Sequence, residues 1–461
     1  MTEVDIDLYD PSALKLELPP GRWDSLLKKA QNFPPGATLW HINSTSAGGG
    51  VAEMLYPMIG LARSVGIATR WLVIDGPAEF FDVTKRIDNG VSGVEGDGGP
   101  LDEAEIALYE RVSAHVASEL SPYIRSGDRV VLHDPQTAGL CAGLRALGAI
   151  VTWRAHNGAD QPNEHTARSW NLLHRYICQA DGLIATTDNF RPPQLGEIPY
   201  VSIAPFIDPT AAKNRALTES DVLARLERWG IIEGNARPSH VPTGYELYRE
   251  GPPPTPHTPM VAQISRWDRV KDMVGVIDSF ERSIAPFSDV HLTLAGPEVT
   301  GVADDPEAAD YLAYCVSRWR QLPREIRRRV QLVCLPMADI TENALTVNAL
   351  QRHAVVVTQK STSEGFGLTV AEAMWKRTPV VATAVGGIRL QIPTPEQGAT
   401  VPLDAPDDLF GRIVRELLEH PQRRRSIGEG GREHIRTHFL PDTQLIADIE
   451  FFEQLSLEVT V

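Results

Sequence analysis

The chain has 461 residues, of which 42% are hydrophobic and 23% charged, so it is long enough for two globular domains of ordinary composition. No apolar run approaches the roughly 20 residues of a membrane-spanning helix, and the acidic start, MTEVDIDLYDPS, lacks the features of a signal peptide, so we expect a cytoplasmic protein. The formal net charge of −16 disfavours binding to nucleic acid or membrane insertion, so a phosphate-bearing substrate would need a local cationic site.

The first half of the sequence alternates strand-like segments with segments of helical period. Strands are predicted at 38–43, 69–75, 129–134, 150–156 and 182–187. Helices are predicted between them at 51–65, 102–120 and 166–178. This alternation predicts βαβ units and a mostly parallel sheet.

Residues 230–258 interrupt the pattern, because they are rich in proline and glycine and have no sustained period. We expect a long loop or linker there. Alternation then resumes, with strands predicted at 260–265, 291–295, 330–335, 355–359 and 380–384. The helices predicted in this half are 272–285, 305–320, 341–353, 368–377, 406–419, 422–438 and 442–455.

We therefore predict an α/β protein built from two Rossmann-like, doubly wound domains that face each other across a cleft. The predicted divisions are an N-terminal domain over 1–206, a linker or insertion over 207–258, a C-terminal domain over 259–440, and a last helix over 441–461 that packs back on the N-terminal domain. Ligands of such sheets bind at the carboxyl ends of the strands, so motifs that follow strands carry the functional signal.

A glycine-rich turn follows the first predicted strand. The segment TLWHIN runs into STSAGGG and then into a helical pattern, which places Gly48, Gly49 and Gly50 at a helix N-terminus where backbone N–H groups can meet a phosphate. The turn lacks the GxGxxG pattern of dinucleotide binders and the GKS or GKT of a P-loop. A tight turn with incidental glycines is the structural alternative.

Two segments of the second half carry the strongest signal. Arg266 and Lys271 follow the strand at 260–265, where two cations could clamp a diphosphate, although such a pair is usually a solvated surface feature. Glu364 follows the strand at 355–359, and GFGLTV then opens a helix that carries Glu372 eight residues further on. Carboxylates accept hydrogen bonds from adjacent hydroxyls, which suits a hexose and a ribose.

These segments resemble the family 4 retaining glycosyltransferases of GT-B fold, which are marked by two glutamates eight residues apart around E-G-F-G. Within that family the chain is similar to the trehalose-forming glycosyltransferring synthases. The similarity spans nearly the whole chain and includes HINSTSAGGGVAEML, IDP at 207–209, SRWDRVKDMVGVID, VNALQ and SEGFGLTVAEAMWK.

The resemblance implies a role for each matching residue. Four are implied to be catalytic: Arg266, Lys271, Glu364 and His156. On the donor, Arg266 and Lys271 would bind the diphosphate, Glu364 the transferred sugar and Glu372 the ribose. The phosphates would also be bound by the backbone of Gly365, Phe366, Gly367, Leu368 and Thr369. Val347 and Asn348 would lie near the base, and Gly48, Gly49 and Gly50 would face the donor from the opposite wall. Asn43, Trp153, Arg154 and His156 would lie on the acceptor side, with a purely structural histidine as the alternative for His156.

The sequence departs from the trehalose-forming pattern on the acceptor side. Where that group usually reads W-R-C-H-I-D, this chain reads WRAHNGAD, so Ala155 replaces a cysteine and Gly158 stands where an aspartate is expected. Ser363 also replaces a common arginine before E-G-F-G. The changes at Ala155 and Gly158 lie on the acceptor side, so they put the identity of the acceptor in question and leave the donor residues intact.

The resemblance implies a retaining hexosyltransferase that moves glucose from UDP-, ADP- or GDP-glucose to glucose and forms trehalose without a metal or other cofactor. A different acceptor, such as a cyclitol or a secondary-metabolite sugar, is the main alternative. An inactive nucleotide-binding scaffold and a phosphorylase of the same fold are alternatives from other classes.

The four scattered cysteines show no metal-binding spacing and predict buried free thiols. A homodimer is compatible with the sequence.

Overall fold

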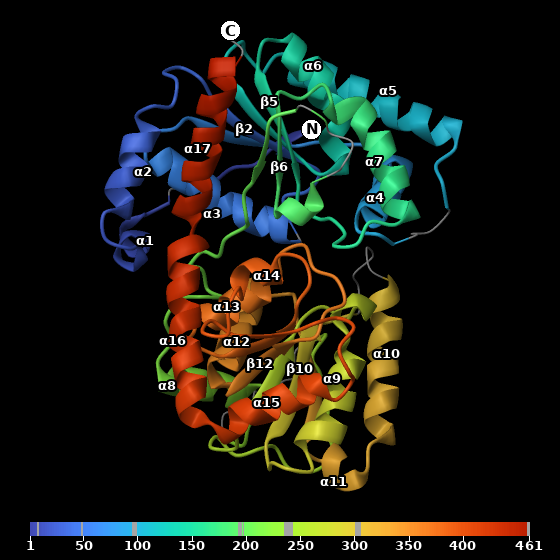
Figure 1. Ribbon diagram of the computed structural model, residues 1–461, viewed down its shortest axis with the longest axis vertical. Coiled ribbons are helices and arrows are strands. Elements are labelled where there is room, and N and C mark those ends of the chain that lie inside the picture. Colours follow the sequence, from blue (N-terminus) through green and yellow to red (C-terminus); the bar gives the residue numbers. More distant parts are fainter. Residues whose placement is uncertain are drawn as a thin grey trace. The chain divides into compact units, whose positions relative to one another are not determined.

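A computed structural model provides the structure of the protein. It describes residues 1–6, 9–47, 49–94, 99–191, 196, 198–234, 243–299 and 306–458. The chain divides into two compact units, each with its own sheet and helices (Figure 1). Unit 1 comprises Met1–Asp208 and His438–Val461, and unit 2 comprises Pro209–Thr437.

Unit 1 contains a seven-stranded sheet of order β1-β3-β2-β4-β5-β6-β7, in which only the short edge strand β1 is antiparallel to its neighbour. Its strands are β1 (Thr2–Glu3), β2 (Leu39–Asn43), β3 (Thr69–Val73), β4 (Arg129–His133), β5 (Ile150–Ala155), β6 (Gly182–Ala185) and β7 (Tyr200–Ser202). The first parallel strand, β2, lies between β3 and β4, so the strand order reverses at this point, and ligands are expected beside the carboxyl ends of these strands.

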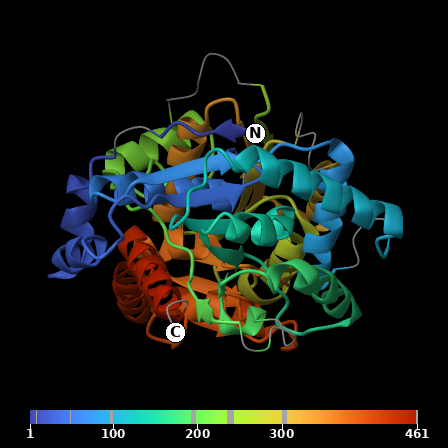
Figure 2. The ribbon, with the colours of Figure 1, turned by 90° about the horizontal axis from the view of Figure 1, so that it is seen from above.

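Helices cover both faces of this sheet (Figures 1 and 2). One face packs against α4 (Ala78–Val91), α5 (Glu103–Leu120), α6 (Cys141–Ala146) and α7 (Glu164–Ile177). The remaining helices of unit 1 are α1 (Ser12–Glu17), α2 (Arg22–Ala30), α3 (Gly50–Ser64) and α17 (Pro441–Glu458), and α17 contacts α2, α3 and β5. Trp40 and Ile42 of β2 join the core formed with α4, α5 and α7, so the alternating His41 and Asn43 point to the opposite face.

Unit 2 contains a seven-stranded sheet of order β14-β13-β12-β9-β10-β11-β8. Its strands are β8 (Glu246–Tyr248), β9 (Met260–Ile264), β10 (His291–Pro297), β11 (Val330–Leu335), β12 (Val356–Gln359), β13 (Val380–Thr383) and β14 (Ala399–Val401). The six strands from β9 to β14 are parallel and follow the 3-2-1-4-5-6 order of a Rossmann sheet. Its helices are α8 (Glu219–Arg228), α9 (Met273–Ser279), α10 (Pro306–Gln321), α11 (Arg324–Arg327), α12 (Ile340–His353), α13 (Leu368–Trp375), α14 (Ile388–Gln391), α15 (Leu409–Glu419) and α16 (Pro421–His438).

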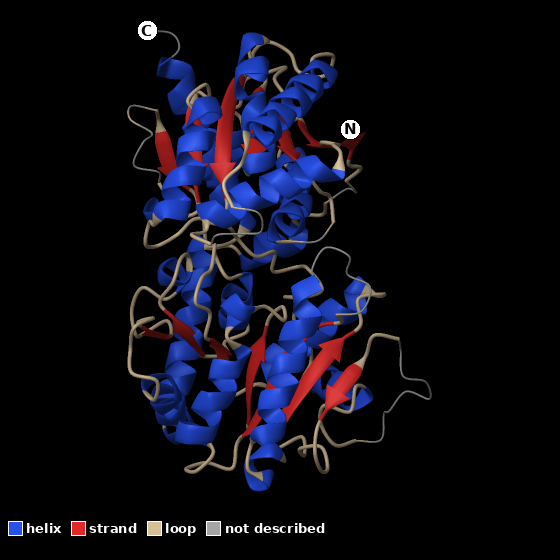
Figure 3. Cartoon of the chain, turned by 90° about the vertical axis from the view of Figure 1, so that its right-hand side faces the viewer, coloured by secondary structure: helices blue, strands red, loops and turns tan. Residues whose placement is uncertain are grey.

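Figure 3 shows strands enclosed by helices within each unit, which confirms the predicted pair of doubly wound α/β sheets. The segment predicted as a linker or insertion, 207–258, is divided between the units, because unit 1 includes Asp208 and unit 2 begins at Pro209. There α8 packs against α12, and β8 extends the sheet by pairing antiparallel with β11. A strand of three residues is too short to show alternation, and the surrounding prolines and glycines concealed it.

All four cysteines are unpaired thiols, and Cys141, Cys315 and Cys334 are buried, as predicted. Within the described ranges, every helix is too short or too polar to cross a lipid bilayer.

Candidate active site

The switch point of the unit 2 sheet brings together two segments that are far apart in the sequence. Strands β9 and β12 are parallel neighbours, so the loops at their carboxyl ends lie side by side. A backbone hydrogen bond of 2.8 Å from Thr362 N to Val270 O joins the two loops. The side chain of Gln263 reinforces the link, because Nε2 donates to Lys271 O at 2.7 Å and Oε1 accepts from Lys360 N at 3.0 Å.

Lys271 and Glu364 meet at this point. Lys271 Nζ donates to Glu364 Oε1 at 2.7 Å, and both side chains are largely buried. Glu364 Oε1 also accepts from Ser361 Oγ at 2.8 Å and from Gln359 Nε2 at 3.2 Å. All hydrogen bonds of this carboxylate within the described residues engage Oε1, which leaves Oε2 for a ligand hydroxyl and leaves two N–H groups of Lys271 for an anion.

The E-G-F-G turn leads directly into α13. Gly367 caps this helix in a left-handed conformation with φ +84°, and Gln391 Nε2 donates to Phe366 O at 2.5 Å and to Gly367 O at 3.3 Å. The first N–H groups of a helix have no partners within it, so this turn offers donors to a phosphate.

Two further glycines hold the turn from the β13 side. Gly386 adopts φ +48°, and a Cβ on it would lie 1.7 Å from Glu364 O. Gly387 N donates to Gly365 O at 3.0 Å, and a Cβ there would lie 2.7 Å from Phe366 Cα. The turn therefore keeps its position only if both residues lack side chains.

We expect Gly386→Ala to destabilise the protein by about 1–3 kcal/mol and to lower activity, because the new methyl group must displace the backbone at Glu364. Gly36→Ala is the matched control, since Gly36 also has positive φ (+83°) but would place its Cβ in open space. Thermal unfolding and kcat measured on both variants check this. Equal activity in the two variants would show that the contact at Gly386 does not position the turn.

Glu372 is 2% exposed on α13 and is surrounded by polar groups. Its Oε2 accepts from Gln351 Nε2 at 3.3 Å, and its Oε1 lies 3.5 Å from Lys213 Nζ. The Glu372 carbonyl accepts from Lys376 Nζ at 2.9 Å, and burial lowers the pKa of Lys376 to about 7. Binding of a ribose to this carboxylate would therefore take place beside Lys213, which the sequence pattern did not indicate.

Two other residues predicted on the donor side lie on α12. Val347 is 7% exposed, and Asn348 is fully buried. Asn348 Nδ2 donates to Ala212 O and Arg215 O, both at 2.9 Å, and Oδ1 accepts from Arg352 Nε at 2.8 Å. Asn348 thus anchors the backbone segment that carries Lys213.

Arg266 lies on the same loop as Lys271 but in a different environment. Its side chain is 62% exposed, and Nη2 lies 3.3 Å from Asp268 Oδ2. Solvent screens this pair, so the contact with Asp268 adds little to holding the guanidinium in place.

In unit 1 the predicted strand, glycine turn and helix occur in order, since β2 ends at Asn43 and α3 begins at Gly50. Gly49 has φ +81° and ψ +159°, a combination open essentially to glycine alone. Gly48 lies outside the described residues. The Asn43 side chain is held by Trp71 Nε1, which donates to Oδ1 at 2.7 Å, and by its own donation to Thr45 O at 2.7 Å.

A group of polar contacts in unit 1 lies where β4 and β5 end. His156 N donates to Asp134 Oδ1 at 3.0 Å, and Trp153 Nε1 donates to Asp134 O at 3.0 Å. Asp134 has φ +62°, and burial, followed by the nearby Asp88, raises its pKa to about 8. The sequence pattern did not indicate Asp134 as a site residue, although Asp134 directly follows β4 at the switch point.

Arg154 is fully buried on β5 and holds neighbouring elements together. Its Nη2 donates to Ile203 O at 2.9 Å and to Gln444 Oε1 at 3.2 Å, and Nη1 lies 3.7 Å from Asp448 Oδ1 on α17. A contact with an acceptor sugar would require Arg154 to leave these partners.

The two departures within WRAHNGAD, Ala155 and Gly158, lie in closely packed surroundings. Ala155 belongs to the core formed with α4, α5 and α7. A Cβ at Gly158 would lie 2.4 Å from the ring of Phe190, so an aspartate does not fit there unless Phe190 moves. Asn189 Nδ2 lies 3.5 Å from Asp160 Oδ1, so Asp160 is tied to the same region.

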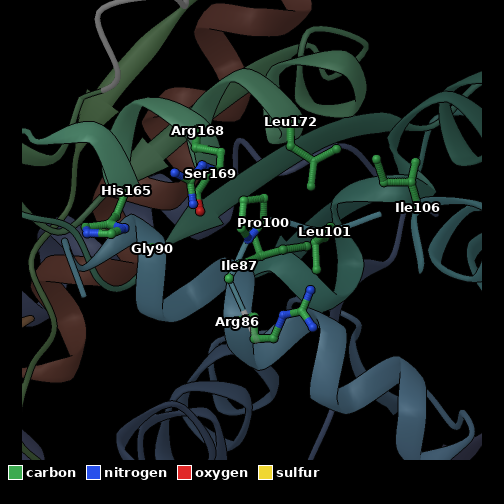
Figure 4. Close-up of a pocket in the computed structure, with 11 residues that line it drawn as sticks. Arg86, Ile87, Gly90, Pro100, Leu101, Ile106, His165, Arg168, Ser169 and Leu172 are labelled. Carbon is green, nitrogen blue, oxygen red and sulfur yellow. The ribbon is translucent and has the colours of Figure 1, made fainter. Parts of the chain in front are cut away.

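A separate hollow of about 140 Å³ lies among α4, α5 and α7 (Figure 4). Its lining includes Ile87, Pro100, Leu101 and Leu172, with Arg86 at one side. Both terminal nitrogens of Arg86 are bound by the Glu105 carboxylate at 2.8 Å. The hollow includes none of the residues predicted to bind donor or acceptor.

Across the described parts of the chain, no group of three or more His, Cys, Asp or Glu side chains is arranged to hold a metal ion.

Comparison with known proteins gives consistent matches. Residues 41–192 match the family described as trehalose synthase, N-terminal domain, and residues 341–434 match glycosyl transferases group 1. A trehalose synthase from Rubrobacter xylanophilus is 34% identical over 429 residues, which cover 91% of each chain. A trehalose phosphorylase from Pleurotus pulmonarius is 25% identical over 90% of this chain and 57% of that protein. The crystal structure of an α,α-trehalose-phosphate synthase (UDP-forming) from Burkholderia vietnamiensis matches with TM-score 0.64 and 14% identity over 91% of this chain and 99% of that chain.

Proposed function

This chain belongs to the trehalose synthase family of glycosyltransferases and has the GT-B fold, and on that premise we propose that it transfers glucose from a nucleoside diphosphate glucose to glucose, forming trehalose with retention of configuration. The family is one of hexosyltransferases acting in trehalose-related chemistry. The observation that supports the donor most directly is the Lys271–Glu364 pair at the switch point, next to the N-terminus of α13.

In this mechanism the bond from the glucosyl anomeric carbon to the diphosphate oxygen breaks while a hydroxyl of the acceptor bonds to the same carbon from the same face. The proton of that hydroxyl passes to the departing diphosphate. Lys271 and Arg266 stabilise the negative charge that develops on the leaving group, with the N–H groups at the start of α13. We propose that these groups take the place of a metal ion or other cofactor in neutralising the diphosphate.

The remaining donor contacts follow from the same arrangement. Glu364 Oε2 accepts from a hydroxyl of the transferred sugar, while Oε1 stays bound to Lys271. Glu372 accepts from the ribose hydroxyls, and Lys213 holds this carboxylate in place. On the acceptor side, His156 and Asp134 lie where β4 and β5 end, and we propose that they face the acceptor sugar.

The donor is tested by incubating the protein with UDP-, ADP- and GDP-glucose, each with and without glucose, and measuring release of the nucleoside diphosphate. We expect release from at least one donor to depend on glucose. The relationship to a trehalose phosphorylase makes phosphorolysis the second candidate. Conversion of trehalose and inorganic phosphate to glucose and glucose 1-phosphate, without nucleotide turnover, would replace the proposal by that reaction. Release that depends on a cyclitol instead of glucose would change the acceptor alone.

A further inference from the structure

Three buried histidines form a line on one face of the unit 1 sheet. His41 Nδ1 lies 3.1 Å from His133 Nε2, and His133 Nδ1 lies 2.9 Å from His156 Nε2. Successive rings are stacked with centroids 5.4 Å and 5.2 Å apart. The residues are 0%, 2% and 8% exposed in chain order, so water does not separate the rings.

The register of the strands produces this line. His41 on β2 pairs with Val131 on β4, two residues before His133. His133 pairs with Arg154 on β5, two residues before His156. Side chains two residues apart share a face, so each step crosses to the next strand and advances toward the carboxyl ends. The line therefore leads from the interior at His41 to the end of β5 at His156.

The three rings share one pattern of protons. Burial lowers the pKa of His41 to about 3 and holds the pKa values of His133 and His156 well below the ordinary range, so each ring is neutral near pH 7 and carries one N–H. If His41 donates to His133, then the only proton of His133 lies on Nδ1 and donates to His156. The opposite direction reverses all three rings together, so the tautomer of one ring fixes the others.

The ends of the line favour one direction. Among the described residues, neither His41 Nε2 nor His156 Nδ1 has a hydrogen-bond partner. Both nitrogens are buried, and a buried N–H without an acceptor is rarer and costlier than an acceptor without a donor. His41 is 0% exposed on β2, whereas His156 is 8% exposed just past the end of β5, where a bound ligand can supply the acceptor that an N–H needs. At the His41 end of the line, the unpartnered Nε2 is therefore expected to carry no proton. The protons then lie on Nδ1 of His41, of His133 and of His156.

We propose that His41 and His133 are positioning residues that hold His156 as a neutral Nδ1–H donor directed to the sugar substrates. This inference rests on the proposed function for the place of His156 at the sugar and for the direction of the protons, and on the geometry for the coupling of the three tautomers. A ring held in this state donates a hydrogen bond at Nδ1 and does not accept the proton of the attacking hydroxyl there. That proton leaves with the diphosphate, which keeps the reaction balanced.

The test is long-range ¹H–¹⁵N NMR at pH 7 on the full chain labelled with ¹⁵N-histidine, with signals assigned through single His→Gln variants. We expect the Nδ1–H tautomer at all three positions. His133→Phe should leave His156 in mixed tautomers and lower kcat about tenfold, with little change in the donor KM. His133→Gln should restore one tautomer at His156, because an amide can both donate and accept.

Thr152→Val is the matched control, because Thr152 shares this face of β5 and its hydroxyl contacts only Val130 O, at 3.2 Å, within the described residues. It should leave the tautomers and kcat unchanged. An Nε2–H or doubly protonated His156 in the unaltered protein would overturn the proposal, even if His133→Phe did not fold. So would a His133→Phe protein with unchanged tautomers. The NMR pattern does not require turnover, so a protein without transferase activity would remove the proposed function and leave the tautomer result to be judged separately.

Discussion

Lys271→Ala is expected to lower kcat/KM for glucosyl transfer by about 10²–10³-fold, the loss typical when one preorganised donor to a developing anion is removed. The ammonium lies at the switch point of the unit 2 sheet, 2.7 Å from Glu364 Oε1, with its remaining N–H groups available to the diphosphate. Most of the loss should appear in kcat, because the charge that Lys271 stabilises grows as the leaving group departs.

Lys360→Ala is the matched control, since Lys360 lies on the neighbouring loop and its ammonium pairs with Asp272 at 2.5 Å. We expect this control to change kcat/KM by no more than about threefold. Thermal unfolding of both variants separates catalysis from stability. A Lys271→Ala protein that is folded and retains the kcat/KM of the Lys360→Ala control would show that Lys271 does not bind the leaving group.

Arg154→Met is expected to lower the stability of unit 1 by about 3–5 kcal/mol, because it leaves a buried carboxylate without its cation. Arg154 and Asp448 are 0% and 1% exposed in their side chains, and Nη1 and Oδ1 are 3.7 Å apart. Burial already raises the pKa of Asp448 to about 6, against the opposing effect of Arg154. Without Arg154 this pKa rises further.

The loss of stability in the Arg154→Met variant should therefore depend on pH. A carboxyl whose pKa is higher in the folded state binds more protons there than in the unfolded chain, so its effect on stability worsens as the pH rises through the folded pKa. We expect a larger loss at pH 8 than at pH 5, measured by urea unfolding with hydrogen exchange of the α17 amides as the local readout.

Two comparisons make this prediction specific. Arg154→Met combined with Asp448→Asn should recover part of the loss and flatten its pH dependence. Arg175→Ala removes an exposed pair, Arg175 Nη2 to Glu110 Oε1 at 3.0 Å, and should cost less than about 1 kcal/mol. Equal losses for Arg154→Met and Arg175→Ala at pH 8 would contradict the structural role of Arg154.

Much of the fold could be predicted from the local spacing of apolar residues along the sequence. The predicted strands at 129–134 and 330–335 correspond to β4 and β11, and the predicted helix at 442–455 corresponds to α17. Buried parallel strands form short apolar runs and helices have a sustained period, so both types are readable from sequence. In contrast, β8 has three residues and is defined by its pairing with β11, which no local pattern carries.

The candidate site was predictable to the extent that its residues follow strands. Lys271 and Glu364 could be placed together because the strands before them are neighbours in a Rossmann sheet, and the structure brings them into contact. The partners Lys213 and Asp134 were missed, since one lies in an irregular segment and the other was read as the last residue of a strand. His41 and His133 are separated by 92 residues in sequence, and their contact depends on strand order and register.

The structure of the product tests trehalose formation most directly. The protein is incubated with unlabelled nucleoside diphosphate glucose and with glucose labelled with ¹³C at its anomeric carbon, and the product is analysed by NMR and mass spectrometry. We expect a non-reducing disaccharide with one labelled and one unlabelled anomeric carbon, both in the α configuration. A reducing disaccharide, a β-configured donor-derived carbon, or free glucose as the only product would contradict it.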